Sequence, residues 1–113
     1  MKHEAKKIAK IVDEILTYFL FNYNARSEIR VDPVPGEYRI TVTCTGVDMS
    51  DEEFAALSKR MVVERQPELE DYYWQLTGET DDSNEMSLVG MMCDSIDIAR
   101  DGSTITLTMV RKV

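Results

Sequence analysis

The sequence predicts an α+β fold, a two-layer sandwich in which a four-stranded mixed sheet of two hairpins carries helices on one face. Three observations predict it. Residues 3–22 repeat apolar side chains at helical spacing, and residues 28–45 and 96–110 each contain alternating stretches joined by a glycine turn. Helix signals occupy the interval between the two alternating regions. At 113 residues the chain is expected to form one domain, 1–113.

The first expected element is a helix over about residues 3–22. Its apolar residues recur every three or four positions: Ala5, Ile8, Val12, Ile15, Phe19 and Tyr23. Three more apolar residues, Ile11, Leu16 and Leu20, flank this stripe and widen it. A wide apolar face suits a helix that lies flat on a sheet, and Asn24 is the expected left-handed stop.

The first hairpin is expected from strands over residues 28–32 and 37–45. In the first strand Ile29 and Val31 share one side. The second strand directs its apolar residues inward and its polar residues outward: Tyr38, Ile40, Val42 and Cys44 against Arg39, Thr41, Thr43 and Thr45. Residues 33–36, with two prolines and a glycine, form the turn.

Three helices are expected next. Ser50 and Glu53 form a capping box, and Met49 with Phe54 forms a hydrophobic staple, at the start of the first helix. Pro67 occupies the first position of the second helix, which ends at Gly78 and whose expected inner face is Leu69, Tyr72, Tyr73 and Leu76. The third helix spans about residues 84–93 and packs through Met86, Val89, Gly90 and Cys93.

The second hairpin is expected to turn at Asp101-Gly102, a dipeptide typical of two-residue turns. Counting outward from this turn places Ile98 opposite Ile105 and Ile96 opposite Leu107. The polar Asp97 and Thr106 then face each other on the other side. Because helices connect the two hairpins, their neighbouring strands are expected to run parallel, which makes the sheet mixed.

The composition limits the classes of partner and the kinds of site that we expect. A net charge of −8 disfavours nucleic acid and anionic membranes. Cys44 and Cys93 are too few for a disulfide framework, and with His3 as the single histidine no metal site is expected. The chain has no signal-peptide pattern, and its longest apolar run, near Phe19, is far below the ~20 residues that span a bilayer. A cytoplasmic location is expected.

Residues 42–54, VTCTGVDMSDEEF, resemble the family of histidine kinases, gyrase-type ATPases and anti-sigma factors. In that family a strand ends in Asp-x-Gly-x-Gly, followed by a small residue and an acidic helix start. The C-terminal part is similar too, with a Leu88-Val89 helix, Asp94, a strand, a Gly102 turn and a Thr-rich strand. The resemblance covers nearly the whole chain in element order, and the short central region is most similar to the anti-sigma branch.

The resemblance implies a relic nucleotide pocket. In the family, an Asn on the first helix, four positions after an acidic or amide residue, ligates magnesium. Here Glu14 matches the acidic residue, but the Asn position is Tyr18, a poor ligand for a hard cation. The family's Asp accepts a hydrogen bond from adenine, and its position here is Cys44, whose sulfur is a weak acceptor.

The phosphate-binding glycines are also replaced. Gly46 matches the first glycine, Asp48 stands at the second, and Glu85 lies in the second glycine motif. Losing two charged hydrogen bonds of about 1.5–3 kcal/mol each weakens binding by roughly 10²–10⁴. The resemblance therefore implies a scaffold without ATP or Mg²⁺ as cofactor. An alternative alignment uses Asn22 or Asn24 as the metal ligand, since Asn24 precedes an alanine as in the family.

Other candidate sites have simpler interpretations. Cys44 and Cys93 are expected to be small buried hydrophobic residues rather than reactive thiols. Residues 81–85 offer oxygen ligands but lack an EF-hand's length and glycine, and residues 51–53 suit a helix N-terminus better than acid–base catalysis. No catalytic residue is expected.

Three adjacent aromatic residues, Tyr72, Tyr73 and Trp74, cannot all face inward from one helix, so they predict a protein-binding patch. Three hypotheses follow. The first is a regulatory domain that binds another protein, with a sigma factor or a signalling regulator as candidate partner, through the region between Glu52 and Glu85. The second is an active ATP-binding kinase-like protein with non-standard ligands. The third is a structural or oligomerising module, and a homo-oligomer stays open in each.

Overall fold

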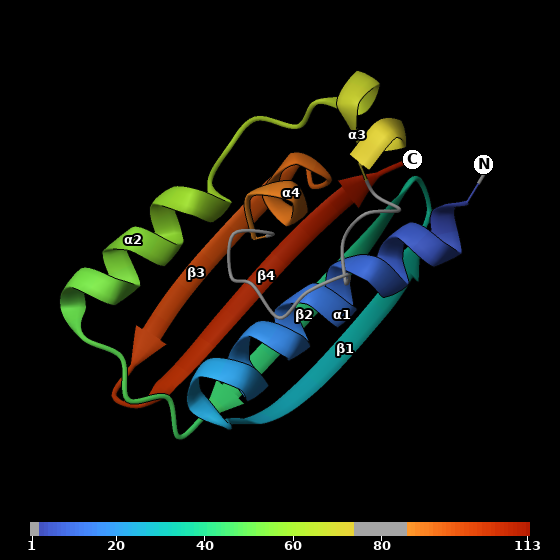
Figure 1. Ribbon diagram of the computed structural model, residues 1–113. Coiled ribbons are helices and arrows are strands. Elements are labelled where there is room, and N and C mark those ends of the chain that lie inside the picture. Colours follow the sequence, from blue (N-terminus) through green and yellow to red (C-terminus); the bar gives the residue numbers. More distant parts are fainter. Residues whose placement is uncertain (1–2, 74–85) are drawn as a thin grey trace.

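The computed structural model describes residues 3–73 and 86–113, with the side chains of residues 71–73 outside that description. Its elements in chain order are α1 (Glu4–Tyr23), β1 (Arg26–Val34), β2 (Glu37–Thr45), α2 (Asp51–Met61), α3 (Pro67–Tyr73), α4 (Met86–Met91), β3 (Ser95–Asp101) and β4 (Thr104–Lys112). This order matches the expected one. The expected α+β class is confirmed, with α1, α2 and α4 on one side of the sheet (Figure 1).

The expected mixed sheet is wrong. The strands follow the order β1-β2-β4-β3, and every neighbouring pair is antiparallel. Strands β2 and β3 do run in the same direction, but β4 lies between them. Burial explains this choice, because Ile105, Leu107 and Met109 of β4 are fully buried and need a central strand. Strand β3 alternates half-buried and exposed residues, which suits an edge.

The second hairpin has a different register from the expected one. Its two central turn residues are Gly102 and Ser103, because Asp101 pairs with Thr104. Ile98 therefore faces Leu107, and Ile96 faces Met109. Gly102 has a φ of 61°, and a glycine at the first central position is the requirement of a type II′ turn. The shift is two residues, so every side chain keeps its expected face of the sheet.

The first hairpin turns at Pro35-Gly36, since Val34 pairs with Glu37. Gly36 has a φ of 81°, as the third residue of a type II turn requires. Inward burial of Ile40, Val42 and Cys44 is confirmed, and Tyr38 is half-buried.

Helix α1 provides one half of the core. Ile11, Ile15 and Phe19 are fully buried, and Asn24 ends the helix in the left-handed conformation, as expected. The buried stripe is rotated slightly from the expected one: Ala5 and Leu20 are exposed, whereas Tyr18 is buried. Among the helices that the structure describes, none is long and apolar enough to cross a membrane.

The capping box at the start of α2 is confirmed. The Glu53 backbone N–H donates to Ser50 Oγ at 3.1 Å, and the Ser50 N–H donates to Glu53 Oε1 at 3.1 Å. Arg100 of β3 ties this helix start to the sheet, because it donates to the Met49 carbonyl at 3.0 Å, pairs with Asp51 and lies 4.8 Å from the centre of the Phe54 ring. Short α2 is thereby anchored at its first turn.

Helix α3 begins at Pro67, as expected. Of its expected inner face only Leu69 is described, because the side chains of Tyr72 and Tyr73, as well as Leu76 and the expected stop at Gly78, lie outside the described residues. Leu69 is 37% exposed, whereas the neighbouring Glu70 is 4% exposed. A buried carboxylate on a short helix requires charged partners, and these partners form the cluster described below.

Candidate functional site

Two residues of the expected relic nucleotide pocket, Glu14 and Tyr18, lie one turn apart on the buried face of α1. Tyr18 is 6% exposed, and its ring meets that of Phe19 edge-on at a centroid distance of 5.0 Å. The Tyr23 ring lies 6.2 Å from it. Tyr18 therefore belongs to an aromatic group in the core, and its ring fills space at the position where the resemblance implies a metal-binding amide.

Cys44 lies at the C-terminal end of β2 in the same hydrophobic core cluster as Tyr18. Its side chain is fully buried, and Ser27 Oγ donates to its Sγ at 3.5 Å. Burial raises the pKa of the Cys44 thiol. Burial likewise raises the pKa of Cys93 to about 12. Both thiols are thus buried and protonated at neutral pH, which confirms their interpretation as small hydrophobic residues.

Two of the remaining pocket residues are not brought into the core. Gly46, with a φ of 77°, and Asp48 lie exposed in the loop between β2 and α2. Glu85 lies outside the described residues. A pocket of about 310 Å³ has Lys6, Ala9, Lys10 and Asp13 as its described lining residues, all on α1. It includes none of Glu14, Tyr18 and Cys44, so the expected site residues do not surround this pocket.

The predicted aromatic patch falls largely outside the description: Trp74 lies beyond the described residues, and Tyr72 and Tyr73 are described only as backbone of α3. The segment before them does expose apolar side chains. Val62 is 63% exposed, and Val63 and Leu69 are also exposed. These three residues, called here the α2–α3 apolar face, lie within the stretch between Glu52 and Glu85 that the sequence predicts as a contact region.

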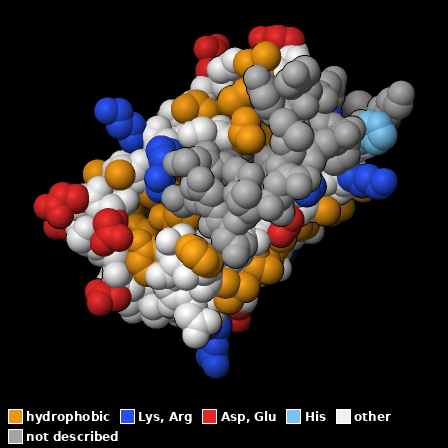
Figure 2. All heavy atoms as spheres, in the orientation of Figure 1, with side chains coloured by type: hydrophobic (Ala, Val, Ile, Leu, Met, Phe, Trp, Pro, Cys, Tyr) orange, Lys and Arg blue, Asp and Glu red, His pale blue; other side chains and the backbone are white. Residues whose placement is uncertain are grey.

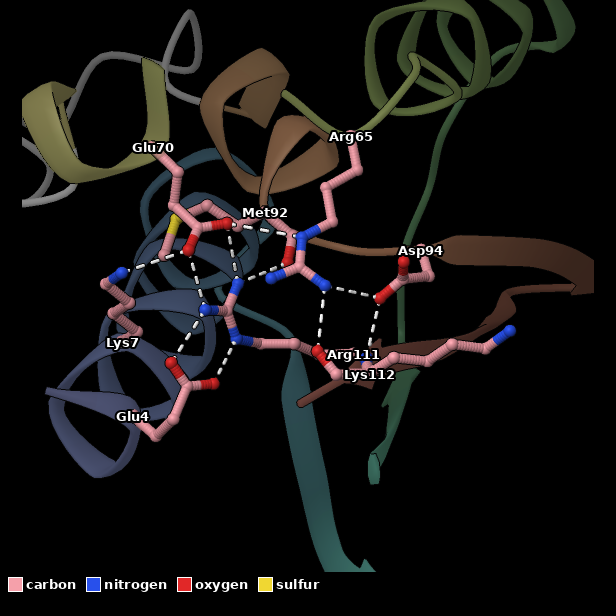
Figure 3. A network of polar contacts seen from close by, with 8 residues as sticks. All are labelled: Glu4, Lys7, Arg65, Glu70, Met92, Asp94, Arg111 and Lys112. Carbon is pink, nitrogen blue, oxygen red and sulfur yellow. Dashed lines mark hydrogen bonds and ion pairs between the residues drawn. The ribbon is translucent and has the colours of Figure 1, made fainter. Parts of the chain in front are cut away.

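The sequence reasoning missed a group of charged residues between the sheet and the helices, called here the Arg111 cluster: Glu4, Lys7, Arg65, Glu70, Asp94 and Arg111. Figure 3 shows their side chains converging from α1, α3, β4 and the connections beside them. Arg111 is 1% exposed and donates to both oxygens of Glu70, at 2.8 and 2.6 Å. It also donates to both oxygens of Glu4, at 2.8 and 2.9 Å. These four hydrogen bonds all go to carboxylates.

Two further cations complete the cluster. The first is Lys7, which donates from Nζ to Glu70 Oε2 at 3.0 Å. Arg111 itself also donates to the Met92 carbonyl, at 2.7 Å. The second further cation is Arg65. Arg65 Nε lies 3.4 Å from Glu70 Oε1, an ion-pair distance. Its NH1 group donates to Asp94 Oδ2 at 2.7 Å and to the Lys112 carbonyl at 2.8 Å. The cluster therefore links both ends of the chain to α3.

The pKa shifts follow from these contacts. Burial by itself raises the pKa of Glu70, but hydrogen bonds from Arg111 and Lys7 outweigh it and lower that pKa to about 2. For Arg111, burial opposes the charge, and hydrogen bonds to Glu70 and Glu4 raise its pKa nonetheless. The hydrogen bond from Arg111 lowers the pKa of Glu4. Glu70, Glu4 and Arg111 therefore stay charged at neutral pH, so the cluster suits a structural role rather than proton transfer.

One signal in the sequence could have revealed the cluster. The alternation that buries Ile105, Leu107 and Met109 places Arg111 on the same buried face of β4. A charged residue at such a position needs a buried partner of opposite charge. The sequence alone does not identify that partner, because Glu70 and Glu4 lie 41 and 107 positions away from Arg111.

Within residues 3–73 and 86–113, no group of three or more histidine, cysteine, aspartate or glutamate side chains is arranged to hold a metal ion. The chain matches no protein-family model, and a search of curated proteins returns no match to it either.

Proposed function

We propose that this chain is a regulatory protein-binding domain on a histidine kinase/anti-sigma factor-type scaffold, and that it works without ordinary ATP binding. The order of helices and strands supports the scaffold, because it is the order on which the resemblance rests. The α+β sandwich with helices on one face of the sheet supports it too (Figure 1).

The observation that carries the proposal is the burial of Tyr18 and Cys44. The resemblance assigns these positions to the magnesium ligand and the adenine acceptor. In this chain both side chains are packed in the hydrophobic core, at 6% and 0% exposure. A buried phenol is a poor ligand for magnesium, and a buried thiol that stays protonated is a weak acceptor for the adenine amino group. The scaffold is then free to act through its surface.

The α2–α3 apolar face supports the choice of surface. Val62, Val63 and Leu69 are large apolar side chains that remain accessible, and the acidic Glu64 and Glu68 beside them are also exposed. Exposed apolar side chains next to charged ones are typical of protein-binding surfaces. In Figure 2 apolar side chains reach the surface at several places on the helical side of the molecule. A partner with apolar side chains and basic residues fits this surface, and the resemblance makes a sigma factor or signalling regulator the candidate.

The nucleotide part of the proposal predicts no thermal stabilisation by Mg·ATP. A ligand at 100 times its Kd adds about 2.7 kcal/mol to the free energy of unfolding. We expect an unchanged melting temperature with Mg·ATP at about 1 mM, measured by differential scanning fluorimetry, since Tyr18 and Cys44 are packed in the core at the positions where the resemblance places the nucleotide's ligands. Mg²⁺ with sulfate at matched ionic strength is the control. A saturable increase specific to ATP would favour the alternative, an active ATP-binding protein.

The proposal that a protein binds the α2–α3 apolar face predicts that a charge introduced on this face abolishes the binding. Val62→Asp places a carboxylate on a side chain that is 63% exposed, so the fold is expected to remain intact. The matched control is Phe21→Asp on α1, where the side chain is 65% exposed. Quantitative affinity capture followed by binding measurements with the recovered protein should show at least a tenfold loss for Val62→Asp alone. Equal loss or equal retention in both variants would favour the structural-module alternative.

A further inference from the structure

Strand β1 has an open edge. It is the first strand of the order β1-β2-β4-β3, and among the described residues no strand pairs with its other side. Val34 and Glu37 close the two-residue turn, so they form a hydrogen-bonded pair, and such pairs alternate along an antiparallel ladder. The odd-numbered residues of β1 therefore direct their N–H and C=O groups to the open edge. Pro33 belongs to this set, so its missing N–H removes no hydrogen bond between β1 and β2.

The charges along β1 alternate in sign. Arg26, Glu28, Arg30 and Asp32 follow one another on the sheet face opposite the helices, because their partners in β2 are the outward-facing Thr45, Thr43, Thr41 and Arg39. Three of these four β1 side chains are exposed, and Asp32 is half-buried beside Arg30, to which it pairs at 2.9 Å. The charges along β1 thus run plus, minus, plus, minus. In an antiparallel second copy of the strand they run minus, plus, minus, plus, so the two strands can present opposite charges to each other.

We propose that β1 pairs antiparallel with β1 of a second copy of this chain, about a twofold axis at Ile29, to form a continuous eight-stranded sheet. In this register Arg26 lies opposite Asp32 of the second copy, and Glu28 lies opposite Arg30. The twofold axis repeats each contact, so four opposite-charge pairs form across the interface. Closed twofold symmetry of this kind is the commonest arrangement of protein dimers.

The charge pattern selects this register over its neighbours. A slip of two residues one way places Arg30 opposite Arg30 and Glu28 opposite Asp32. A slip of two residues the other way places Glu28 opposite Glu28 and Arg26 opposite Arg30. Like charges directly opposite each other destabilise an antiparallel pair. A slip of one residue exchanges the two faces of the sheet and is excluded by burial.

The apolar side of β1 is also covered in this register, although the charges rather than the apolar residues select it. Ile29 and Val31 face the helix side of the sheet, opposite the buried Val42 and Ile40 of β2. They are nevertheless 36% and 38% exposed, because α1 does not cover them fully. Pairing about Ile29 places the two isoleucines against each other and Val31 against Ser27 of the second copy. The dimer thus covers apolar side chains that the single chain leaves in water.

The proposed dimer is independent of the proposed function. Strand β1 forms one edge of the sheet, whereas in Figure 1 α2 lies beside β3 at the opposite edge and α3 lies beside α4 near the C-terminus. A dimer through β1 therefore leaves the α2–α3 apolar face of both copies accessible, and the two surfaces can be tested separately.

The test is a charge-reversal experiment monitored by sedimentation velocity from about 1 μM to 1 mM. The wild-type chain is expected to shift from monomer to dimer over this range. Glu28→Arg and Arg30→Glu each create two like-charge pairs, so each variant alone should dimerise at least about tenfold more weakly. An equimolar mixture of the two variants restores opposite charges at both positions and should form a heterodimer as tight as the wild-type dimer. The double variant should also dimerise.

Asp97→Arg on the other edge strand, β3, is the matched control, because Asp97 is exposed on the same face of the sheet. It should dimerise as the wild type does. Circular dichroism and melting temperature check that each variant is folded. A wild-type chain that remains monomeric at about 1 mM overturns the proposal. Single variants that dimerise normally, or a mixture that stays monomeric, overturn it as well.

Discussion

Replacing Arg111 with alanine is expected to lower the free energy of unfolding by about 3–5 kcal/mol, the usual cost of removing one partner from a buried ion pair. Arg111 is 1% exposed and holds Glu70, which is 4% exposed, through two hydrogen bonds. Without the guanidinium, Lys7 and the more distant Arg65 are the charged partners that the described residues still offer to the Glu70 carboxylate. Chemical denaturation at pH 7 measures the change.

The loss should shrink at acid pH. In the wild type the pKa of Glu70 is lowered to about 2 from an ordinary value of 4.5, chiefly because the hydrogen bonds from Arg111 and Lys7 outweigh burial. A carboxylate with a lowered pKa contributes stability above pH 4.5, and this contribution disappears as the pH falls toward 2. The variant lacks most of that contribution at any pH. The two denaturation curves should therefore approach each other between pH 4.5 and pH 2.

Arg39→Ala is the matched control for Arg111→Ala. Arg39 also lies on a central strand and pairs with a glutamate, Glu37, at 2.7 Å, but its side chain is 59% exposed. Exposed ion pairs contribute little, so a change within about 0.5 kcal/mol is expected. Adding Glu70→Gln to Arg111→Ala should recover part of the loss, because the unpaired buried charge disappears. Similar losses for both arginines would contradict the structural role of the cluster.

Replacing Gly90 with alanine is expected to destabilise the protein by about 1–3 kcal/mol. A Cβ at this position of α4 would lie 2.3 Å from the Met61 carbonyl oxygen and 2.8 Å from Val63 Cγ2. Helix propensity acts in the opposite direction, since alanine is favoured over glycine by about 0.8–1.0 kcal/mol. A lower free energy of unfolding for Gly90→Ala would therefore indicate that α4 and the end of α2 approach this closely, and a higher one would indicate that they do not.

Two further variants sharpen the result for Gly90. Ser87→Ala in the same helix removes no close packing and should change the unfolding free energy by less than about 0.5 kcal/mol. Val63→Ala combined with Gly90→Ala removes the side-chain clash but leaves the contact with the Met61 carbonyl, so it should restore only part of the stability. A more stable Gly90→Ala chain would show that α2 and α4 are farther apart than this arrangement requires.

The local elements could be predicted from the sequence because their causes are local. The Ser50–Glu53 capping box involves residues three positions apart, and the Asn24 helix stop depends on one residue's conformation. Alternation in β2 and β4 assigns each side chain to a face of the sheet. The assignment is correct although the predicted register of the second hairpin was wrong by two residues, because a shift of two keeps every side chain on its face. In that turn, the choice of Asp101-Gly102 rather than Gly102-Ser103 as the central residues was wrong.

The candidate sites were harder to predict, because contacts between distant residues define them. Tyr18 is buried and Leu20 is exposed because of the way α1 is rotated on the sheet. This rotation depends on contacts with residues of other helices and strands. Leu69 was expected inside, yet it is exposed in the structure, whereas the neighbouring Glu70 is buried. Arg111 attracts the nearby carboxylate more strongly than the core attracts one leucine, since an unpaired buried charge is far more costly than an exposed apolar side chain.

The sequence by itself determined the class of the fold, the order of its elements and the face on which each strand residue lies, because spacing and capping act over a few positions. Only the tertiary structure decided that β4 lies between β2 and β3, and that Glu4, Glu70 and Arg111 meet in one buried cluster. The physical reason is the same in both cases. Burial and ion pairing depend on distance in space, and the spacing of residues along the chain does not contain that distance.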